Sequence, residues 1–265
     1  MARVFAAGIV TAAAGAPDLS SYSYEQWMNE YGIAENSAAA EATFNANLAG
    51  IKEHNEANTD FFLAPNKFMA MNGEQFASFV KGRSSTGPLF QGQAKKADLD
   101  FTNVPESKDW RDVDGVVSDV KDQGGCGSCW AFSAVETLES HLSIATGSAS
   151  PKLSPQQIVS CSPNPQHCGG TGGCDGSTQP LAFDYTKTAG ITTESDYPYR
   201  GTTGTCDTSK IKPVAFNDGY AELTVNNYTE LVTAAGTKGP ISISIAAGGF
   251  KFQFYGGGVL SNCND

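Results

Sequence analysis

Two cysteines, Cys126 and Cys129, are separated by two residues in the stretch QGGCGSCWAFS, directly before a segment with helical periodicity. Such a pair has three common uses: zinc ligation, thiol–disulfide exchange, or one structural cysteine beside one reactive cysteine. A cysteine at the start of a helix feels the positive end of the helix dipole, which lowers the pKa of its thiol. The pattern therefore favours a reactive Cys129 anchored by Cys126.

Gln123 lies six residues before Cys129, in a glycine-rich turn. Its side-chain amide and the backbone N–H of Cys129 could both donate to an oxyanion, which indicates nucleophilic attack on a carbonyl. A redox pair is less favoured because no strand of a strand–helix–strand unit precedes it, and five further cysteines compete for pairing. Zinc stays as the other alternative, although a long helix starting at Cys129 and a secretory start speak against it.

Three helices are predicted around these residues. The first follows Cys129 and ends near Gly147, and the second begins with Ser154 as N-cap and Pro155 at the first helical position. A third, short helix is expected near residues 181–185. The first helix carries its apolar face on Phe132, Val135, Leu138 and Leu142.

The flanking segments have different patterns. Residues 21–55 predict two amphipathic helices, and residues 81–103 read as an exposed linker rich in Gly, Ser and Lys. From about residue 213 the apolar period becomes two, which predicts a β-rich region. The alternating residues are Ile241, Ile243 and Ile245, and then Phe250, Phe252 and Phe254.

Composition limits the class of protein. The 265 residues carry 28 acidic against 17 basic side chains, a net charge of −11, which argues against a nucleic-acid partner. The apolar, alanine-rich start predicts a secretory signal peptide, and seven cysteines then suggest disulfides. No other segment has the roughly 18 apolar residues of a membrane span. We expect the secretory pathway, with a lysosome-like acidic compartment or the cell exterior as destination.

The segment QGGCGSCWAFS resembles the active-site segment of the papain-like cysteine proteases, the cathepsin family. The segments LSPQQIVSC, GGCDGS, GITTESDYPY and GPISISIAA follow in the family's order. In front, FNANLAGIKEHN and APNKF resemble two motifs of the inhibitory propeptide, although the expected Glu and Arg are Asn36 and Ala40. The resemblance covers the chain from about residue 22 onward.

The resemblance implies an α+β, papain-like two-domain fold: a helical half and a β-barrel-like half, preceded by a small helical prodomain. We expect a signal peptide over residues 1–16 and an inhibitory propeptide with its linker over 17–103. The helical half with the nucleophile would occupy 104–212, and a partial, truncated β-rich half 213–265.

The resemblance also assigns roles to residues. Cys129 matches the catalytic nucleophile, Gln123 the oxyanion donor and Trp130 the residue packed behind the nucleophile. Ser177 stands where the family has glycine, which we expect to narrow the edge that pairs with substrate near P2. The residues expected on the substrate-binding side are Trp130, Gly176, Ser177 and Ser244.

The resemblance implies two disulfides and leaves two cysteines over. Cys168 has no counterpart in the family, and the usual partner of the cysteine matched by Cys263 lies further downstream. No metal and no cofactor are implied. The implied pairs are Cys126–Cys174 and Cys161–Cys206.

The family's general base is a histidine, oriented by an asparagine, beyond the position of Cys263. The sequence holds three histidines, and His141 lies 12 residues along the Cys129 helix, about 18 Å away. His54 falls in the pro-like segment and His167 in the cysteine-rich loop. We therefore expect an endopeptidase fragment that lacks the catalytic His and Asn and is inactive as written. The alternative is a natural, non-catalytic relative that binds or inhibits proteases.

Further expectations concern partners and modification. Peptides or proteins would be the substrates, with an apolar or aromatic P2 residue, and the chain's own propeptide would be an inhibitor. We expect a monomer. Asn227-Tyr228-Thr229 is the only glycosylation sequon, so Asn227 is the candidate glycan site.

Overall fold

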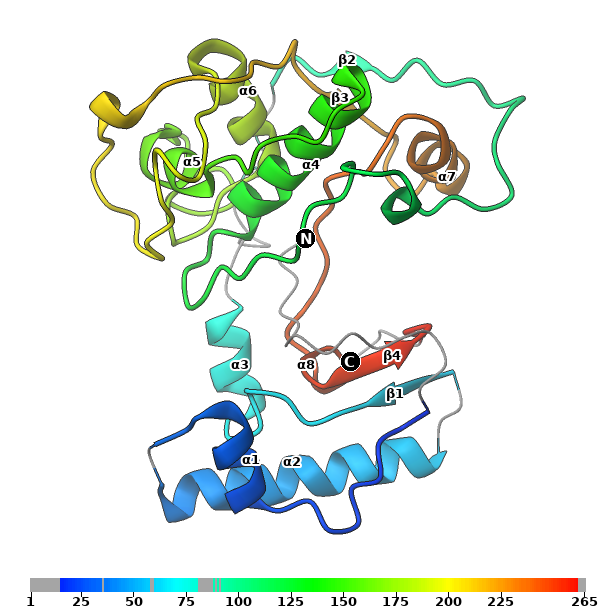
Figure 1. Cartoon of the computed structure of the whole chain (residues 1–265), viewed down its shortest axis with the longest axis vertical. Helices are drawn as coiled ribbons and strands as arrows, with labels where there is room; N and C mark the ends of the chain where they lie inside the picture. The colour runs from blue at the N-terminus through cyan, green and yellow to red at the C-terminus, as the bar shows by residue number, and fades with distance from the viewer. Residues whose placement is uncertain are drawn as a thin grey trace. The chain divides into compact units, whose positions relative to one another are not determined.

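A computed structural model describes residues 15–34, 36–57, 60–80, 88, 90 and 92–261 (Figure 1). The chain forms two compact units. The disulfide unit holds residues 81–245, and the aromatic unit joins residues 15–80 to 246–261. Most of the expected signal peptide, and Cys263, lie outside the described residues. None of the described helices is long and apolar enough to cross a membrane.

The aromatic unit contains helices and one strand pair. Ser23 and Asn72 each form a capping box at the start of a helix, with Gln26 and Gln75 respectively. Strand β1 pairs antiparallel with β4, about 190 residues later in the chain, with Phe61 opposite Gly258. The elements are α1 Tyr24–Tyr31, α2 Ala38–Ala57, β1 Phe61–Leu63, α3 Gly73–Phe79, α8 Phe250–Gln253 and β4 Tyr255–Gly258.

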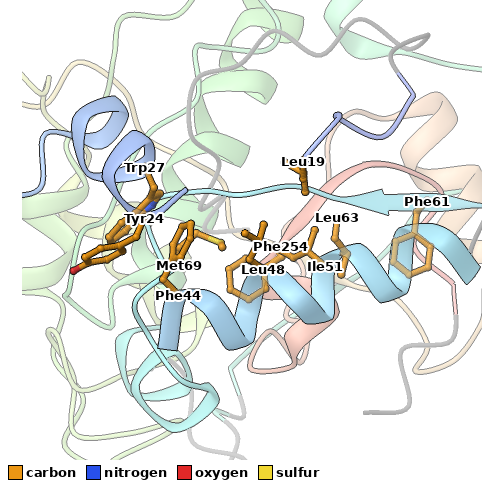
Figure 2. Close-up of a cluster of buried hydrophobic side chains, with 10 residues drawn as sticks. All are labelled: Leu19, Tyr24, Trp27, Phe44, Leu48, Ile51, Phe61, Leu63, Met69 and Phe254. Carbon is orange, nitrogen blue, oxygen red and sulfur yellow. The ribbon is translucent and has the colours of Figure 1, made fainter. Parts of the chain in front are cut away.

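Half of the buried residues in the core of this unit are aromatic. Figure 2 shows Tyr24, Trp27 and Phe44 together near one end of α2, where the ring centroids of Trp27 and Phe44 are 5.6 Å apart. Phe254 lies in the same cluster and is fully buried. The segment 246–261 therefore supplies part of the core that the N-terminal helices surround.

Three asparagines from the propeptide-like motifs satisfy backbone groups in this unit. The Asn47 amide donates to the carbonyl of Met69 at 2.9 Å. Asn55 both donates to the Leu63 carbonyl and accepts from the Leu63 N–H, each at 2.8 Å. Asn66 donates to the Gln253 carbonyl at 2.6 Å. The three side chains thus bond to backbone groups of strand β1, of Met69 and of the C-terminal segment. Without these bonds, those backbone groups would lack a partner.

The disulfide unit is mainly helical. The second core cluster of the protein lies in this unit, around α4, and includes Trp130, Ala134, Leu153 and Ile158. A short parallel pair, β2 with β3, ties Lys95 to Ala221. The elements are β2 Lys95–Lys96, η1 Trp110–Asp112, α4 Cys129–Thr146, α5 Pro155–Cys161, α6 Gln179–Ala189, η2 Thr208–Lys210, β3 Ala221–Glu222 and α7 Tyr228–Thr237.

The helix predictions are confirmed. Helix α4 begins at Cys129 and ends at Thr146, and its C-cap Gly147 is left-handed with φ of 67°. Helix α5 has Ser154 as N-cap, accepting from the Gln157 N–H, and Pro155 in its first turn. The bounds of the two compact units nevertheless differ from the predicted domains, because each unit joins segments that are distant in the chain. The linker joins the disulfide unit through β2 and β3, and 246–261 joins the aromatic unit through β1 and β4.

The prediction of a β-rich region from residue 213 is wrong for the described residues. Residues 239–248 carry no strand, because side chains rather than a backbone ladder hold them. Ser242 bonds to Ser133 of α4 at 2.6 Å, and the Ile243 carbonyl accepts from Gln179 of α6 at 3.2 Å. Phe250 and Phe252 lie in the short helix α8, and Phe254 is its C-cap; the rings of Phe250 and Phe254 pack edge to face with centroids 5.0 Å apart.

Candidate active site

Cys129 is the first residue of α4 and is partly exposed. The positive end of the helix dipole at this position favours the thiolate over the thiol. The turn before it is held closely, since the Gly127 N–H donates to the Cys174 carbonyl at 2.9 Å. The nucleophile expected from the sequence is therefore placed at a helix start by a turn with little freedom.

The turn before Cys129 is joined to the loop at residues 173–177. The disulfide Cys126–Cys174 links the two, and Gly127 forms a parallel bridge with Asp175. The Trp130 indole donates to the Gly173 carbonyl at 3.1 Å. These ties bring the loop with Gly176 and Ser177, both expected on the substrate side, against the turn before the nucleophile.

Trp130 itself is 1% exposed and belongs to the second core cluster. The indole therefore lies in the core and offers almost no surface to a ligand, and the role behind the nucleophile stays a prediction.

Gln123 is buried, with 4% of its surface exposed. Its Nε2 donates to the Cys126 carbonyl at 2.8 Å, and its Oε1 has no hydrogen-bond partner among the described residues. A side-chain amide carries two N–H groups, so one remains for an oxyanion. The expected donor is thus held by a bond within its own turn.

Ser177 and Ser244 differ in their surroundings. Ser177 is fully buried, and its hydroxyl accepts from the Asn164 amide at 3.3 Å, so the side chain is held by the 164–170 loop. Ser244 is exposed, and its hydroxyl accepts from the Gln179 amide at 3.0 Å.

Both expected disulfides are present. Cys126 bonds to Cys174 and Cys161 bonds to Cys206. Because Cys126 is bonded to Cys174, the zinc and redox interpretations of the Cys126–Cys129 pair are wrong. Cys168 takes part in neither bridge and is 1% exposed. Within the described residues no group of His, Cys, Asp and Glu could hold a metal ion.

The three histidines have other surroundings. His141 lies on α4, and its Nε2 contacts the Pro240 carbonyl at 3.0 Å. His167 is exposed in a left-handed conformation with φ of 54°. His54 belongs to the aromatic unit, with its ring 4.5 Å from that of Phe61. In the described part of the chain, the contacts of these histidines are thus with Pro240 and Phe61.

Glu139, on α4, forms a buried ion pair with Lys121. The Glu139 carboxylate is 3% exposed, pairs with Lys121, and accepts from the Leu153 N–H at 2.7 Å. Burial raises the pKa of the nearby Glu194, whose Oε1 accepts from the Tyr199 N–H at 2.8 Å. The bonds of Glu139 therefore attach to α4 the chain before it, at Lys121, and the chain after it, at Leu153.

Two residues of the site escaped the sequence analysis. The Tyr199 hydroxyl donates to the Gln123 carbonyl at 2.8 Å and lies 2.7 Å from the Ser128 hydroxyl. Ser128 is the N-cap of α4, but its side chain makes no cap bond within the described chain. The only signal was the aromatic pair in DYPYR, some 70 residues away, which no local pattern links to the cysteine turn.

Asn227, the sequon asparagine, caps α7. Its Oδ1 accepts from the Glu230 N–H at 3.1 Å, and its Nδ2 donates to the Glu230 carboxylate at 2.9 Å. A glycan would use this Nδ2, which keeps one N–H after attachment, so the cap could persist.

Comparison with known proteins identifies the class. The family model described as "Papain family cysteine protease" matches residues 104–265, and the chain belongs to this family. It is 36% identical over 248 residues to vignain from Phaseolus vulgaris, covering 90% of this chain and 66% of vignain. It is 38% identical over 224 residues to a cathepsin L-like proteinase from Phaedon cochleariae, covering 83% and 66%. The chain thus spans about two thirds of the length of these relatives.

Solved structures agree with the papain-like fold. The proform of the ragweed pollen cysteine protease Amb a 11 superposes with a TM-score of 0.81 at 34% identity, covering 90% of this chain and 73% of that protein. A recombinant stem bromelain precursor superposes with a TM-score of 0.78 at 31% identity, covering 90% and 76%. Both relatives are precursor forms by name.

Proposed function

We propose that this chain is the precursor of a papain-like cysteine endopeptidase in which Cys129 attacks the peptide carbonyl. The observation that carries the proposal is the placement of a partly exposed cysteine at the start of α4, three residues after Cys126, whose carbonyl holds the buried amide of Gln123 at 2.8 Å. The second N–H of that amide and the Cys129 backbone N–H would receive the oxyanion. A thioester acyl-enzyme would form as the leaving amine departs.

The leaving amine needs a proton, and the 265 residues do not include the histidine and asparagine expected beyond Cys263. The helix dipole by itself contributes only about 0.3–1 kcal/mol toward the thiolate, less than a tenfold change in its fraction. The polypeptide of these 265 residues therefore supplies the nucleophile and the oxyanion donors, but not amide hydrolysis.

The propeptide would act as the chain's own inhibitor. Within the disulfide unit, the Pro88 carbonyl accepts from the Gly169 N–H at 3.1 Å. A Cβ on Gly169 would lie 2.8 Å from the Ser177 carbonyl, so this contact adjoins the expected substrate edge. The linker would thereby compete with a peptide for the same loop. We place the protein in the secretory pathway, where its two disulfides are stable.

The test is acylation by the p-nitrophenyl ester of N-acetyl-phenylalanyl-glycine, whose leaving group needs no proton. At pH 8.5, where a thiolate is available, we expect about one equivalent of p-nitrophenolate and an acyl group on Cys129. The matching peptide amide should remain uncut. Cys129→Ser should abolish the release of p-nitrophenolate, and a protease cut in the linker between residues 82 and 104 should accelerate acylation.

Two outcomes would contradict the proposal. If Cys129 is acylated no faster than a free cysteine in solution, it is not an activated nucleophile. If the 265-residue polypeptide hydrolyses the amide in a Cys129-dependent way, a base such as His167 acts in place of the expected histidine.

A further inference from the structure

Two serines occupy N-cap positions in the disulfide unit, and they behave differently. The Ser154 hydroxyl accepts from the Gln157 N–H at 3.0 Å, as an N-cap serine usually does. The Ser128 hydroxyl makes no such bond within the described chain, and its backbone has φ −102° and ψ 16° instead of the extended conformation of Ser154. It lies 2.7 Å from the Tyr199 hydroxyl, and more loosely, at 3.4 Å, from the Cys126 carbonyl.

The proton positions follow from the acceptors. Tyr199 has one hydroxyl proton, and the Gln123 carbonyl, 2.8 Å away, can only accept it. Ser128 then donates to the Tyr199 oxygen at 2.7 Å in preference to the Cys126 carbonyl, which is farther away at 3.4 Å. Burial raises the pKa of Tyr199, with Asp122 and Glu194 acting in the same direction, so the hydroxyl stays a donor at working pH.

Tyr199 is itself held in place from two sides. Its ring packs edge to face on Phe132 of α4, with centroids 4.8 Å apart. Its backbone N–H donates to the half-buried carboxylate of Glu194, on which the charges of Lys121 and Glu139 act. The hydroxyl therefore sits at a defined point between the two ends of the turn 123–128.

We propose that Tyr199 is a positioning residue for the oxyanion site: its hydroxyl clamps the Gln123 backbone to Ser128, the residue before Cys129. Gln123 carries one proposed oxyanion donor, and the peptide N–H that follows Ser128 is the other. The clamp sets the separation of the two donors. The inference rests on the proposed function of Cys129 as an acyl-forming nucleophile.

The test compares two reactions of Cys129 in the full chain. Acylation by the p-nitrophenyl ester of N-acetyl-phenylalanyl-glycine builds an oxyanion, whereas alkylation by iodoacetamide does not. For Tyr199→Phe we expect acylation about tenfold slower, because a displaced oxyanion donor loses part of its effect. Alkylation, followed by peptide mass mapping at Cys129, should stay within about twofold of the unmodified chain because no oxyanion donor takes part.

Matched variants complete the design. Tyr185→Phe removes a hydroxyl that accepts from Gln157 at 3.1 Å and should leave both rates unchanged. Tyr199→Phe should have a smaller effect in a Gln123→Ala background, because the two changes act on one donor. Ser128→Ala breaks the other half of the clamp and should slow acylation even if Tyr199→Phe does not fold.

The inference is overturned if Tyr199→Phe acylates at the normal rate, or if acylation and alkylation fall together, as a purely structural role would require. For a Tyr199→Phe chain that does not fold, normal acylation of Ser128→Ala overturns it. Failure of the proposed function has a different signature, since the unmodified chain would then show no enhanced acylation at all.

Discussion

The disulfide unit and the aromatic unit are stabilised by different chemistry. The disulfide unit carries two cross-links that span 48 and 45 residues, and it buries the Glu139–Lys121 ion pair. The aromatic unit has no cysteine among its described residues and relies on a core that includes Tyr24, Trp27 and Phe44. The disulfide unit therefore adds covalent cross-links and a buried ion pair to its apolar core, whereas the aromatic unit combines aromatic and aliphatic burial with side-chain bonds to its backbone.

The difference suits the two roles proposed for them. Cross-links reduce the entropy of the unfolded chain, so the unit that positions Cys129 keeps its geometry even if the other unit opens. The aromatic unit depends on residues 246–261, which reach its core from a distant part of the sequence. Its stability therefore depends on a non-local contact between the propeptide-like residues 15–80 and a segment that the protease family model covers.

The largest expected effect comes from the cross-links. Replacing Cys161 and Cys206 by serine should lower the free energy of unfolding of the disulfide unit by about 4 kcal/mol, because a loop of this length gains entropy in the unfolded state. Hydrogen exchange with mass spectrometry should show faster exchange in α5 and α6. Peptides from α1 and α2 are the internal control, and equal acceleration there would mean that the units are not separately stabilised.

A comparable effect is expected from the aromatic core. Phe254→Ala removes a fully buried ring and should cost about 3–4 kcal/mol of the stability of the aromatic unit. Exchange should then accelerate in α1, α2 and β1, while α4 stays protected. Phe216→Ala, at a ring that is 64% exposed, is the matched control. If Phe254→Ala left α1 and α2 protected, residues 246–261 would not be part of their core.

The smallest expected effect is on the pH dependence of the stability of the disulfide unit. Burial raises the pKa of Glu194 in the folded chain, so the folded state binds this proton more tightly than the unfolded state. Its contribution to stability is complete below the ordinary glutamate range and is lost as pH rises through the raised pKa. Glu194→Gln should therefore gain stability relative to the unmodified chain between pH 4 and pH 7.

This prediction is checked by thermal melts across that pH range. The difference between the two melting temperatures isolates Glu194 from the carboxyls whose pKa is lowered, such as Asp196 and Asp207, which act in the opposite direction. The exposed Glu222→Gln is the control. A difference that does not change with pH would show that Glu194 has no part in the pH dependence.

Much of the disulfide unit was predictable because its signals are local. The start of α4 at Cys129, and the Ser154 cap with Pro155 of α5, depend on residues within one or two turns of each other. The resemblance added the pairing of Cys126 with Cys174, which no local pattern specifies. The position of Gln123 in the cysteine turn was predicted from its spacing, but its bond to the Cys126 carbonyl was not.

The incorrect predictions share a physical cause. An alternating apolar pattern predicts a strand only if a partner strand is available, and residues 239–248 instead bond to side chains of α4 and α6. Residues 250–254 were predicted as a strand, yet they form helix α8 and its C-cap, and Phe254 packs in a core made with residues from the N-terminal part of the chain. The period of the apolar residues cannot distinguish a strand from these outcomes, because the contacts that decide the structure come from distant parts of the chain.

The sequence by itself predicted Cys129 as the candidate nucleophile, and it determined the helix that begins there and the acidic, cysteine-rich character of the chain, since these depend on residue type and short spacing. Only the tertiary structure decided that Tyr199 clamps Gln123 to Ser128, and that residues 246–261 close the aromatic core. These features join residues some 70 to 190 positions apart. Their partners are selected by the geometry of the folded chain, which no local spacing encodes.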